Sequence, residues 1–285
     1  MDTIKQLLRG ILGKKYGWIV QEYNQLKAYL YSFLHPYHYT PKRYIDTFLI
    51  YNSKITDEAI IHKKAPSIIY IFWTGDNEIT PNRMAGIKSL EKNAHVEVKL
   101  ITNKNLKDYI IDEDPLPEAY QYLSFVHKSD YLRSYFMHHY GGGYADIKTH
   151  LKSWIRAFEK LNYSEAYAIG YREVGHWGVA DINHNYQELR QDLQNYWRLL
   201  IGNCAFICRP HTKFTEEWHR EVNRVLASHS EALRKHPAKD AFGTNTDYPL
   251  RWTEIQGEVF HPLCLKYHKK ILADNCLKPS FKNYR

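Results

Sequence analysis

The chain has 285 residues, of which 44% are hydrophobic and 25% are charged, as in an ordinary globular protein rather than a disordered chain or a disulfide scaffold. Its longest strongly apolar run, Ile68–Trp73, is far shorter than the roughly 20 residues of a transmembrane helix, so the sequence predicts no membrane span. The formal net charge of +8 fits anionic partners such as nucleotides, nucleic acid or anionic lipid.

The N-terminal 60 residues are rich in Lys, Tyr and Leu, and we expect a helical extension at 1–60 before one domain at 61–285. Apolar residues follow one helix face along residues 4–12, with Lys5 and Arg9 off that face. Two interpretations stay open: residues 1–20 bind an anionic membrane surface, or this helix packs on its own domain. A second helical stretch is predicted at Arg43–Asn52.

The location of the protein is predicted from its charges and its cysteines. Lysine and arginine interrupt the first 20 residues, which leaves no continuous apolar segment of a secretory signal. The spacings of the four cysteines match no zinc-binding pair. We therefore expect reduced thiols in a cytoplasmic protein, peripheral on the inner face of the plasma membrane.

A strand, a helix and a second strand follow at Ile68–Trp73, Pro81–Asn93 and Val96–Thr102. This order predicts an α/β fold with an open, mostly parallel sheet flanked by helices. Ligands of such sheets bind at the carboxyl ends of the strands, so the turn Thr74–Asn77 is a candidate binding edge.

The central segment, residues 126–151, combines a helix, three glycines and a strand. Ser129 is the expected cap of a helix that ends at Gly141–Gly143, and residues 144–151 alternate as a strand. Asp130 and Arg133 then share one helix face. Asp146 and Lys148 would project to one side of the strand, about 7 Å apart. Such groups can bind a divalent ion, ribose or phosphate; alternatively, Asp130 and Arg133 form a surface ion pair and Asp146 is solvated.

Two strings in this segment carry a family resemblance. SDYLR at residues 129–133 and GGGYAD at 141–146 resemble the donor-site signature of retaining nucleotide-sugar transferases with the GT-A fold. The similarity is to glycosyltransferase family 32 and the bacterial capsular-polysaccharide-synthesis transferases, and it extends from Pro66 to about Phe260.

The resemblance implies specific roles. Trp73 and Thr74 would line the nucleoside pocket, while Asp130 and Arg133 would contact the donor sugar. Asp146 would touch ribose, sugar or metal. The family usually has a second Asp where this chain has Lys148, which brings the expected Mn²⁺ or Mg²⁺ into question.

Two accounts of Lys148 remain open. In one, its ammonium replaces the metal beside the diphosphate. In the other, it pairs with Asp146, and a metal is held by Asp146 with a late residue such as His261, which ends a predicted strand at Val259–Pro262.

Further strands are expected at Ile169–Tyr171 and Ile201–Ile207, and a helix at Lys213–Ser228. The resemblance places acceptor-binding residues on the strand at 201–207 and in the polar segment near residue 250. The candidates are Asn203, Asp247, Tyr248, Trp252 and Glu254.

The resemblance thus predicts a hexosyltransferase that moves a hexose from a nucleotide diphosphate, UDP above all, to a glycan or lipid-linked glycan of capsule or lipopolysaccharide. Retention would run by front-side attack or through a carboxylate such as Glu173, Asp181 or Asp247. The competing hypotheses are a basic nucleic-acid-binding module and a membrane-surface adaptor with a degenerate transferase fold. No RNP1-like string or long basic helix is present, so we expect no nucleic acid partner.

Overall fold

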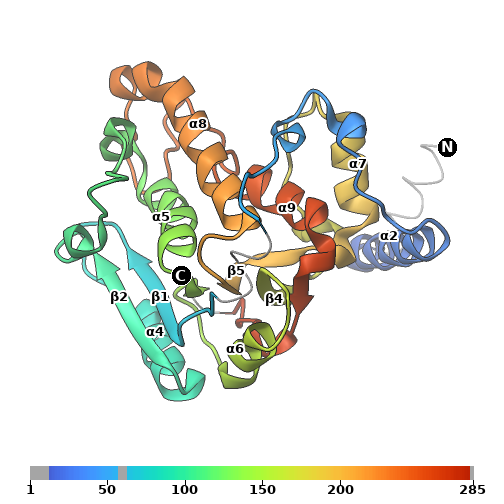
Figure 1. The fold of residues 1–285 in the computed structure, drawn as a ribbon, viewed down its shortest axis with the longest axis horizontal. Coiled ribbons are helices and arrows are strands. Elements are labelled where there is room, and N and C mark those ends of the chain that lie inside the picture. The colour runs from blue at the N-terminus through green and yellow to red at the C-terminus, as the bar shows by residue number, and fades with distance from the viewer. Residues whose placement is uncertain (1–12, 57–62, 283–285) are drawn as a thin grey trace.

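The computed structural model describes residues 13–56 and 63–282, in which helices cover both faces of a six-stranded open sheet (Figure 1). The strand order is β2-β1-β3-β5-β4-β6. The strands are β1 Ile68–Trp73, β2 Glu97–Thr102, β3 Gly142–Ala145, β4 Ala168–Arg172, β5 Ile201–Cys208 and β6 Ile271–Ala273. Pairs β1–β2, β1–β3 and β4–β6 are parallel, while β5 runs antiparallel to β3 and β4. The predicted α/β fold with a mostly parallel sheet is confirmed.

Seven α-helices lie within the described residues. They are α2 Lys14–Leu34, α4 Pro81–Ala94, α5 Phe125–His139, α6 Ile155–Asn162, α7 Gln187–Asn195, α8 Lys213–Lys235 and α9 Gly257–Lys266. The second helical stretch expected near residue 43 is replaced by two short 3-10 turns, Pro41–Tyr44 and Phe48–Ile50. The predicted helix at residues 4–12 lies outside the described residues.

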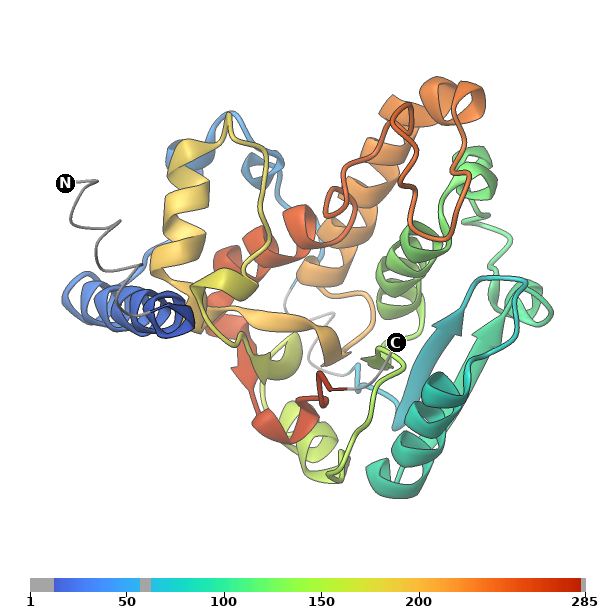
Figure 2. The same ribbon diagram turned by 180° about the vertical axis from the view of Figure 1, so that it is seen from behind.

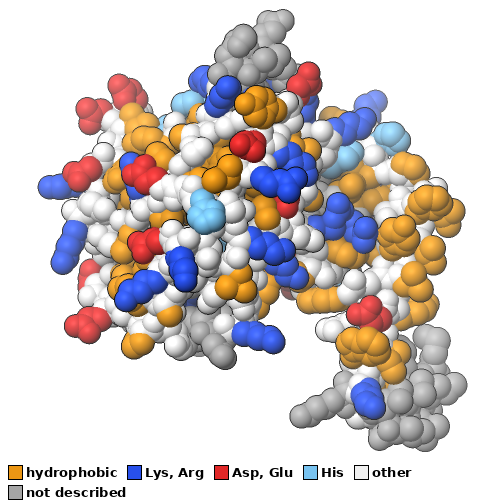
Figure 3. Space-filling model, turned by 90° about the horizontal axis from the view of Figure 1, so that it is seen from below, with side chains coloured by type: hydrophobic (Ala, Val, Ile, Leu, Met, Phe, Trp, Pro, Cys, Tyr) orange, Lys and Arg blue, Asp and Glu red, His pale blue; other side chains and the backbone are white. Residues whose placement is uncertain are grey.

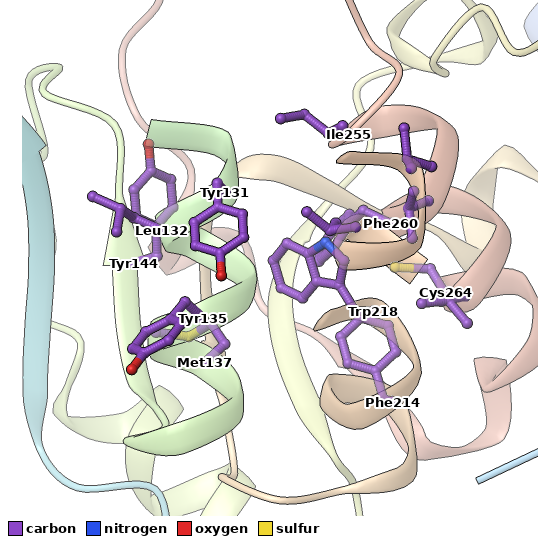
Figure 4. Packing of buried hydrophobic residues seen from close by; sticks show 14 of the residues in the cluster. Tyr131, Leu132, Tyr135, Met137, Tyr144, Phe214, Trp218, Ile255, Phe260 and Cys264 are labelled. Atoms are coloured by element: carbon purple, nitrogen blue, oxygen red, sulfur yellow. The ribbon is translucent and has the colours of Figure 1, made fainter. Parts of the chain in front are cut away.

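The core has two parts because side chains of the strands alternate between the two faces of the sheet. On β1, Tyr70 and Phe72 belong to the larger cluster, whereas Ile69 and Ile71 belong to the other cluster. Helices α5, α8 and α9 cover the larger cluster, and α4 and α6 cover the opposite face (Figures 1 and 2). Figure 4 shows the larger cluster, where aromatic side chains of α5, α8 and α9 gather.

The N-terminal segment packs at the far end of the molecule, where α2 lies beside α7 (Figures 1 and 2). Arg43 pairs with the buried carboxylate of Asp192 at 2.7 Å, and the Tyr44 hydroxyl donates to the same carboxylate at 2.7 Å. The Nζ atom of Lys266 on α9 donates to the backbone oxygen of Tyr51 at 2.7 Å. Residues 41–51 are therefore fixed to α7 and α9, while the division at residue 60 stays a prediction.

Candidate active site

Helix α5 carries two of the predicted site residues and begins earlier than its sequence predicts. Its cap is Ser124, whose hydroxyl accepts from the backbone of His127, whereas Ser129 lies in the second turn of the helix. The prediction of a cap at Ser129 is wrong, because an earlier serine already satisfies the first free N–H groups. The Thr74 hydroxyl donates to the Phe125 oxygen at 2.6 Å, which ties the carboxyl end of β1 to the start of α5.

The glycines after α5 turn the chain into β3. Gly141 has φ of 65° and Gly142 has φ of 85°, the left-handed region that favours glycine. A Cβ atom on Gly141 would lie 2.5 Å from the Pro210 side chain. The predicted stop of the helix at these glycines is confirmed, and the turn delivers Asp146 directly after β3.

The strand expected to continue to residue 151 ends instead at Ala145. The Asp146 backbone N–H donates to the Cys204 oxygen at 2.7 Å, and the Lys148 N–H then turns back to the Asp146 oxygen at 2.7 Å. This tight turn is held by α4, whose Arg83 donates to the Ile147 oxygen at 2.7 Å. The side chains of Asp146 and Lys148 lie together through this turn, and not through the strand alternation that the sequence predicted.

Four charged side chains form one network at this point. The Arg133 guanidinium reaches Asp130 Oδ1 at 3.2 Å and Asp146 Oδ1 at 3.3 Å. The Lys148 ammonium lies 2.6 Å from Asp146 Oδ2. The Tyr144 hydroxyl donates to Asp146 Oδ1 at 2.6 Å, and the guanidinium stacks on the Tyr144 ring at 4.5 Å. The alternative of an Asp130–Arg133 surface pair with a solvated Asp146 is wrong, because these side chains are only 6%, 11% and 19% exposed.

The electrostatics of this network follow from burial and mutual attraction. Burial raises the pKa of Asp146, but the charges of Lys148 and Arg133 outweigh it and hold that pKa well below its usual range. Burial lowers the pKa of Lys148, yet Asp146 reverses this effect and raises it. For Asp130, burial dominates and raises the pKa despite Arg133. Both basic groups are therefore charged and face the Asp146 carboxylate.

The residues around Asp146 do not fit a divalent cation. Both carboxylate oxygens are already occupied, one by Arg133 and Tyr144 and the other by Lys148. Two positive side chains lie within 3.3 Å of these oxygens and would repel a metal ion at the same place. His261 offers no second ligand here, since its ring contacts the backbone N–H of Ala180 and lies 3.5 Å from the Glu173 carboxylate.

His261 also lies in a different element from the one predicted. The strand expected at Val259–Pro262 is wrong, because these residues form part of helix α9. Nearly every residue of α9 is buried, and a short apolar run that is buried all round has no periodicity to separate helix from strand.

Several other predicted site residues lie near the network. Asn203 precedes Cys204 on β5, and its backbone oxygen accepts from Arg133 at 3.3 Å. The hydroxyl of Tyr248 lies 2.8 Å from Nδ1 of His127, one turn before Asp130 on α5. The backbone oxygen of Trp252 lies 3.4 Å from the other nitrogen of that imidazole.

The remaining predicted residues have separate surroundings. Trp73 donates through its indole N–H to the Asn77 oxygen at 2.8 Å, in the turn after β1. Asp247 is exposed and pairs with His236 at 3.1 Å. Glu254 lies 3.3 Å from Arg251 and lines a different pocket, between α7, α8 and α9. Asp247 and Glu254 thus have partners of their own outside the charged network.

Residues that the sequence did not single out complete the surroundings of the network. His127 was detectable, because it is three residues before Asp130 and therefore on the same helix face. Cys204 lies 3.2 Å from the Lys148 ammonium, but only the antiparallel pairing of β3 and β5 reveals it. Phe281 in the C-terminal segment contacts Tyr171 and lies under the same ammonium at 5.2 Å.

Comparison with known families decides the relationship of the chain. The family model for capsular polysaccharide synthesis proteins matches residues 16–177, more than half of the chain. The chain belongs to the capsular polysaccharide synthesis protein family. The region that matches this family includes β1, α5 and β3, and therefore the whole charged network. Among curated proteins and solved structures, none matches the chain.

Proposed function

We propose that this member of the capsular polysaccharide synthesis family is a retaining hexosyltransferase with a GT-A-like fold. It transfers a hexose from a UDP-linked donor to a glycan or lipid-linked glycan during capsule or lipopolysaccharide assembly. The observation that carries the proposal is the network of Asp130, Arg133, Asp146 and Lys148 at the carboxyl ends of β1 and β3, in which two residues are buried and two are nearly so. Buried charges are costly for stability alone, which favours a functional reason for keeping four of them together.

In the proposed complex, Asp130 and Arg133 bind the hydroxyls of the donor sugar. The Arg133 Nε atom is buried and has no hydrogen-bond partner among the described residues, so it can donate to a ligand oxygen. Burial raises the pKa of Asp130, so a sugar hydroxyl that donates a hydrogen bond to this carboxyl would favour its ionised form. Thr74 and Trp73, at the end of β1, take the nucleoside side of the donor.

The leaving group is a nucleoside diphosphate, which needs positive charge as its bond to the sugar breaks. We assign this role to Lys148, with Arg133, instead of to a divalent cation at Asp146. The ammonium is buried and charged, and a fixed charge in a site shielded from water stabilises an anion more strongly than one in solution.

The acceptor side is assigned to the aromatic group around His127. Its ring stacks on Tyr248 at 5.6 Å and lies 6.4 Å from the Trp252 ring, which is half-exposed. Of these three rings only that of Trp252 is exposed, and its flat face suits a sugar. We propose retention by front-side attack, since Glu173 is held beside His261 and Asp181 is exposed and paired with Arg190 at 2.8 Å.

Thermal unfolding with UDP-hexoses, UDP alone and random RNA tests the donor site. At 100 times Kd a ligand stabilises by about 2.7 kcal/mol, which corresponds to a rise of roughly 5–10 °C in Tm. We expect this rise for the wild type and for Arg220→Ala, an exposed control, but not for Arg133→Lys. Stabilisation by RNA alone, or an equal shift in Arg133→Lys, would contradict the assignment.

A membrane surface is the second proposed partner, and helix α2 carries it. Ile19, Tyr23, Leu26, Leu30 and Phe33 recur at spacings of four and three residues, and each is at least 43% exposed. Figure 3 shows hydrophobic side chains gathered over this arm of the molecule. None of the described helices is long and apolar enough to cross a membrane. An amphipathic helix in a chain of net charge +8 fits the surface of an anionic bilayer.

Vesicle sedimentation tests this second partner. Wild type should bind phosphatidylglycerol vesicles more than phosphatidylcholine vesicles, and Leu26→Glu with Leu30→Glu should abolish binding. Leu151→Glu, at an exposed apolar residue outside α2, is the control. The proposal would be refuted if the variant with Leu26→Glu and Leu30→Glu bound vesicles as well as wild type. It would also be refuted if the wild type dimerised through α2 and did not bind lipid.

A further inference from the structure

A histidine cluster lies on the side of α5 that faces away from the charged network. Nε2 of His139, in the last turn of α5, lies 2.7 Å from Asp114 Oδ2. Nε2 of His219 on α8 lies 2.8 Å from the same oxygen. The rings of His138 and His211 also pack here, 4.8–5.6 Å from those of their neighbours. Three separate segments of the chain thus bring imidazoles and one carboxylate to a single place.

Both ring nitrogens of His219 have polar neighbours. Nδ1 lies 3.3 Å from the Ser134 hydroxyl, which also contacts the Tyr131 oxygen at 2.9 Å. Nε2 lies 3.0 Å from the Asn223 amide nitrogen. In the tautomer that carries its proton on Nδ1, the lone pair of Nε2 faces Asp114 and is available to a metal ion.

Two imidazole nitrogens converge on one carboxylate oxygen. Nε2 of His219 lies 2.8 Å and Nε2 of His139 lies 2.7 Å from Oδ2 of Asp114. A metal ion bound by these three atoms would replace the protons of the two His–Asp hydrogen bonds. Metal-binding histidines commonly donate their other N–H to a protein oxygen, and Nδ1 of His219 has the Ser134 hydroxyl as such a partner at 3.3 Å.

We propose that Asp114, His139 and His219 form a binding site for a divalent transition-metal ion, with Zn²⁺ as the best fit. Two imidazoles and one carboxylate are the ligand types that Zn²⁺ takes, with a fourth position for water. The three ligand atoms lie within 4.8 Å of one another. Zinc–ligand bonds of about 2.0–2.2 Å separate tetrahedral ligands by about 3.3 Å, so Asp114 must withdraw by about 0.5 Å.

The surroundings allow both this movement and entry of the ion. Asp114 is on a loop with 32% of its side chain exposed, whereas the two histidines are nearly buried. A surface depression lined by Asp114, Pro117 and Asn223 opens beside the cluster. Bound metal would join this loop to α5 and α8, and so support the helix that carries Asp130 and Arg133.

Titration of the metal-free protein with Co²⁺, and then competition by Zn²⁺, tests the site. Wild type should bind one equivalent with the visible absorption of four- or five-coordinate Co²⁺, and without the intense near-ultraviolet band of cysteine thiolate ligands. Zn²⁺ should displace the cobalt and raise Tm. His229→Gln, on the same helix but outside the cluster, should behave as wild type.

Asp114→Asn and His219→Gln should lose the cobalt spectrum and the rise of Tm with Zn²⁺. If His219→Gln does not fold, the conservative change at partly exposed Asp114 decides alone. Absence of saturable binding by wild type would overturn the proposal. Retention of the spectrum in Asp114→Asn, or a thiolate band, would overturn it as well.

Discussion

Replacing Lys148 by methionine should reveal how deeply the charges of the site are buried. Methionine keeps the length and apolar body of the side chain but removes the ammonium that lies 2.6 Å from Asp146. The chain offers a matched control in Lys235, whose ammonium lies 2.6 Å from Glu231, also in an ion pair. The two pairs differ in surroundings: the Lys148 side chain is 6% exposed, and that of Lys235 is 58% exposed.

The expected losses of stability follow from this difference. Removing one partner of a buried pair costs about 3–5 kcal/mol, because the other charge stays buried. Asp146 keeps Arg133 and Tyr144, so we expect the lower end, about 3 kcal/mol, for Lys148→Met. That loss corresponds to a fall in Tm of about 6–12 °C. An exposed pair contributes about 0–1 kcal/mol, so Lys235→Met should be nearly neutral.

Urea denaturation of both variants, with unfolding followed by circular dichroism, measures the difference. The double variant Lys148→Met with Asp146→Asn should lose less than the sum of the single variants, because it leaves no unpaired charge at this pair. Equal small losses in Lys148→Met and Lys235→Met would refute the reasoning, since they would show that the Lys148 ammonium is solvated.

Three further predictions concern turnover and pH. Arg133→Ala should slow turnover at least about tenfold, because a charged hydrogen bond contributes about 1.5–3 kcal/mol; a folded variant with normal turnover would exclude the donor role. Mn²⁺ should leave the turnover of chelator-treated wild type nearly unchanged. Lys148→Ala should lose turnover, and Lys148→Asp should regain some of it only when Mn²⁺ is added. A metal requirement in the wild type would contradict this prediction. Burial lowers the pKa of His150 to about 4, below about 6.5 in the unfolded chain, so the unfolded state binds more protons between these values. The free energy of unfolding should therefore fall by up to about 3 kcal/mol from pH 6.5 to 4. If the unfolding free energy of His150→Phe depends on pH as steeply as that of the wild type, another group causes the fall.

Local sequence patterns were sufficient to predict the first two strands of the sheet and the helix between them. The strand at Ile68–Trp73 has the predicted bounds, and α4 and β2 differ from prediction by one residue each. These elements have an apolar run or a period of their own between clear turn residues. The end of β3 could not be predicted, because it depends on pairing with β5, which lies about 60 residues later in the chain.

The site residues also divide into those that local spacing predicts and those that only the packing of distant elements brings together. Asp130 and Arg133 lie one turn apart on a helix, so spacing alone predicted this pair. Asp146 and Lys148 were expected on one side of a strand, but they meet through the turn after β3. That the two pairs meet through Arg133 and Asp146 depends on how α5 packs against β3. Polar composition suggested Asp247 for the acceptor site, but the side chain is held by a neighbouring amide and by His236.

Consumption of UDP-hexose with release of UDP, in the presence of capsular oligosaccharide, tests the central claim most directly. The full-length chain should be compared with Asp146→Asn and with Asp112→Asn, in which an exposed carboxylate changes. We predict that wild type and Asp112→Asn release UDP at similar rates, and that Asp146→Asn is at least about tenfold slower, as expected for the loss of charged hydrogen bonds. Equal rates in all three proteins, or no consumption of any UDP-hexose, would contradict the proposed transferase.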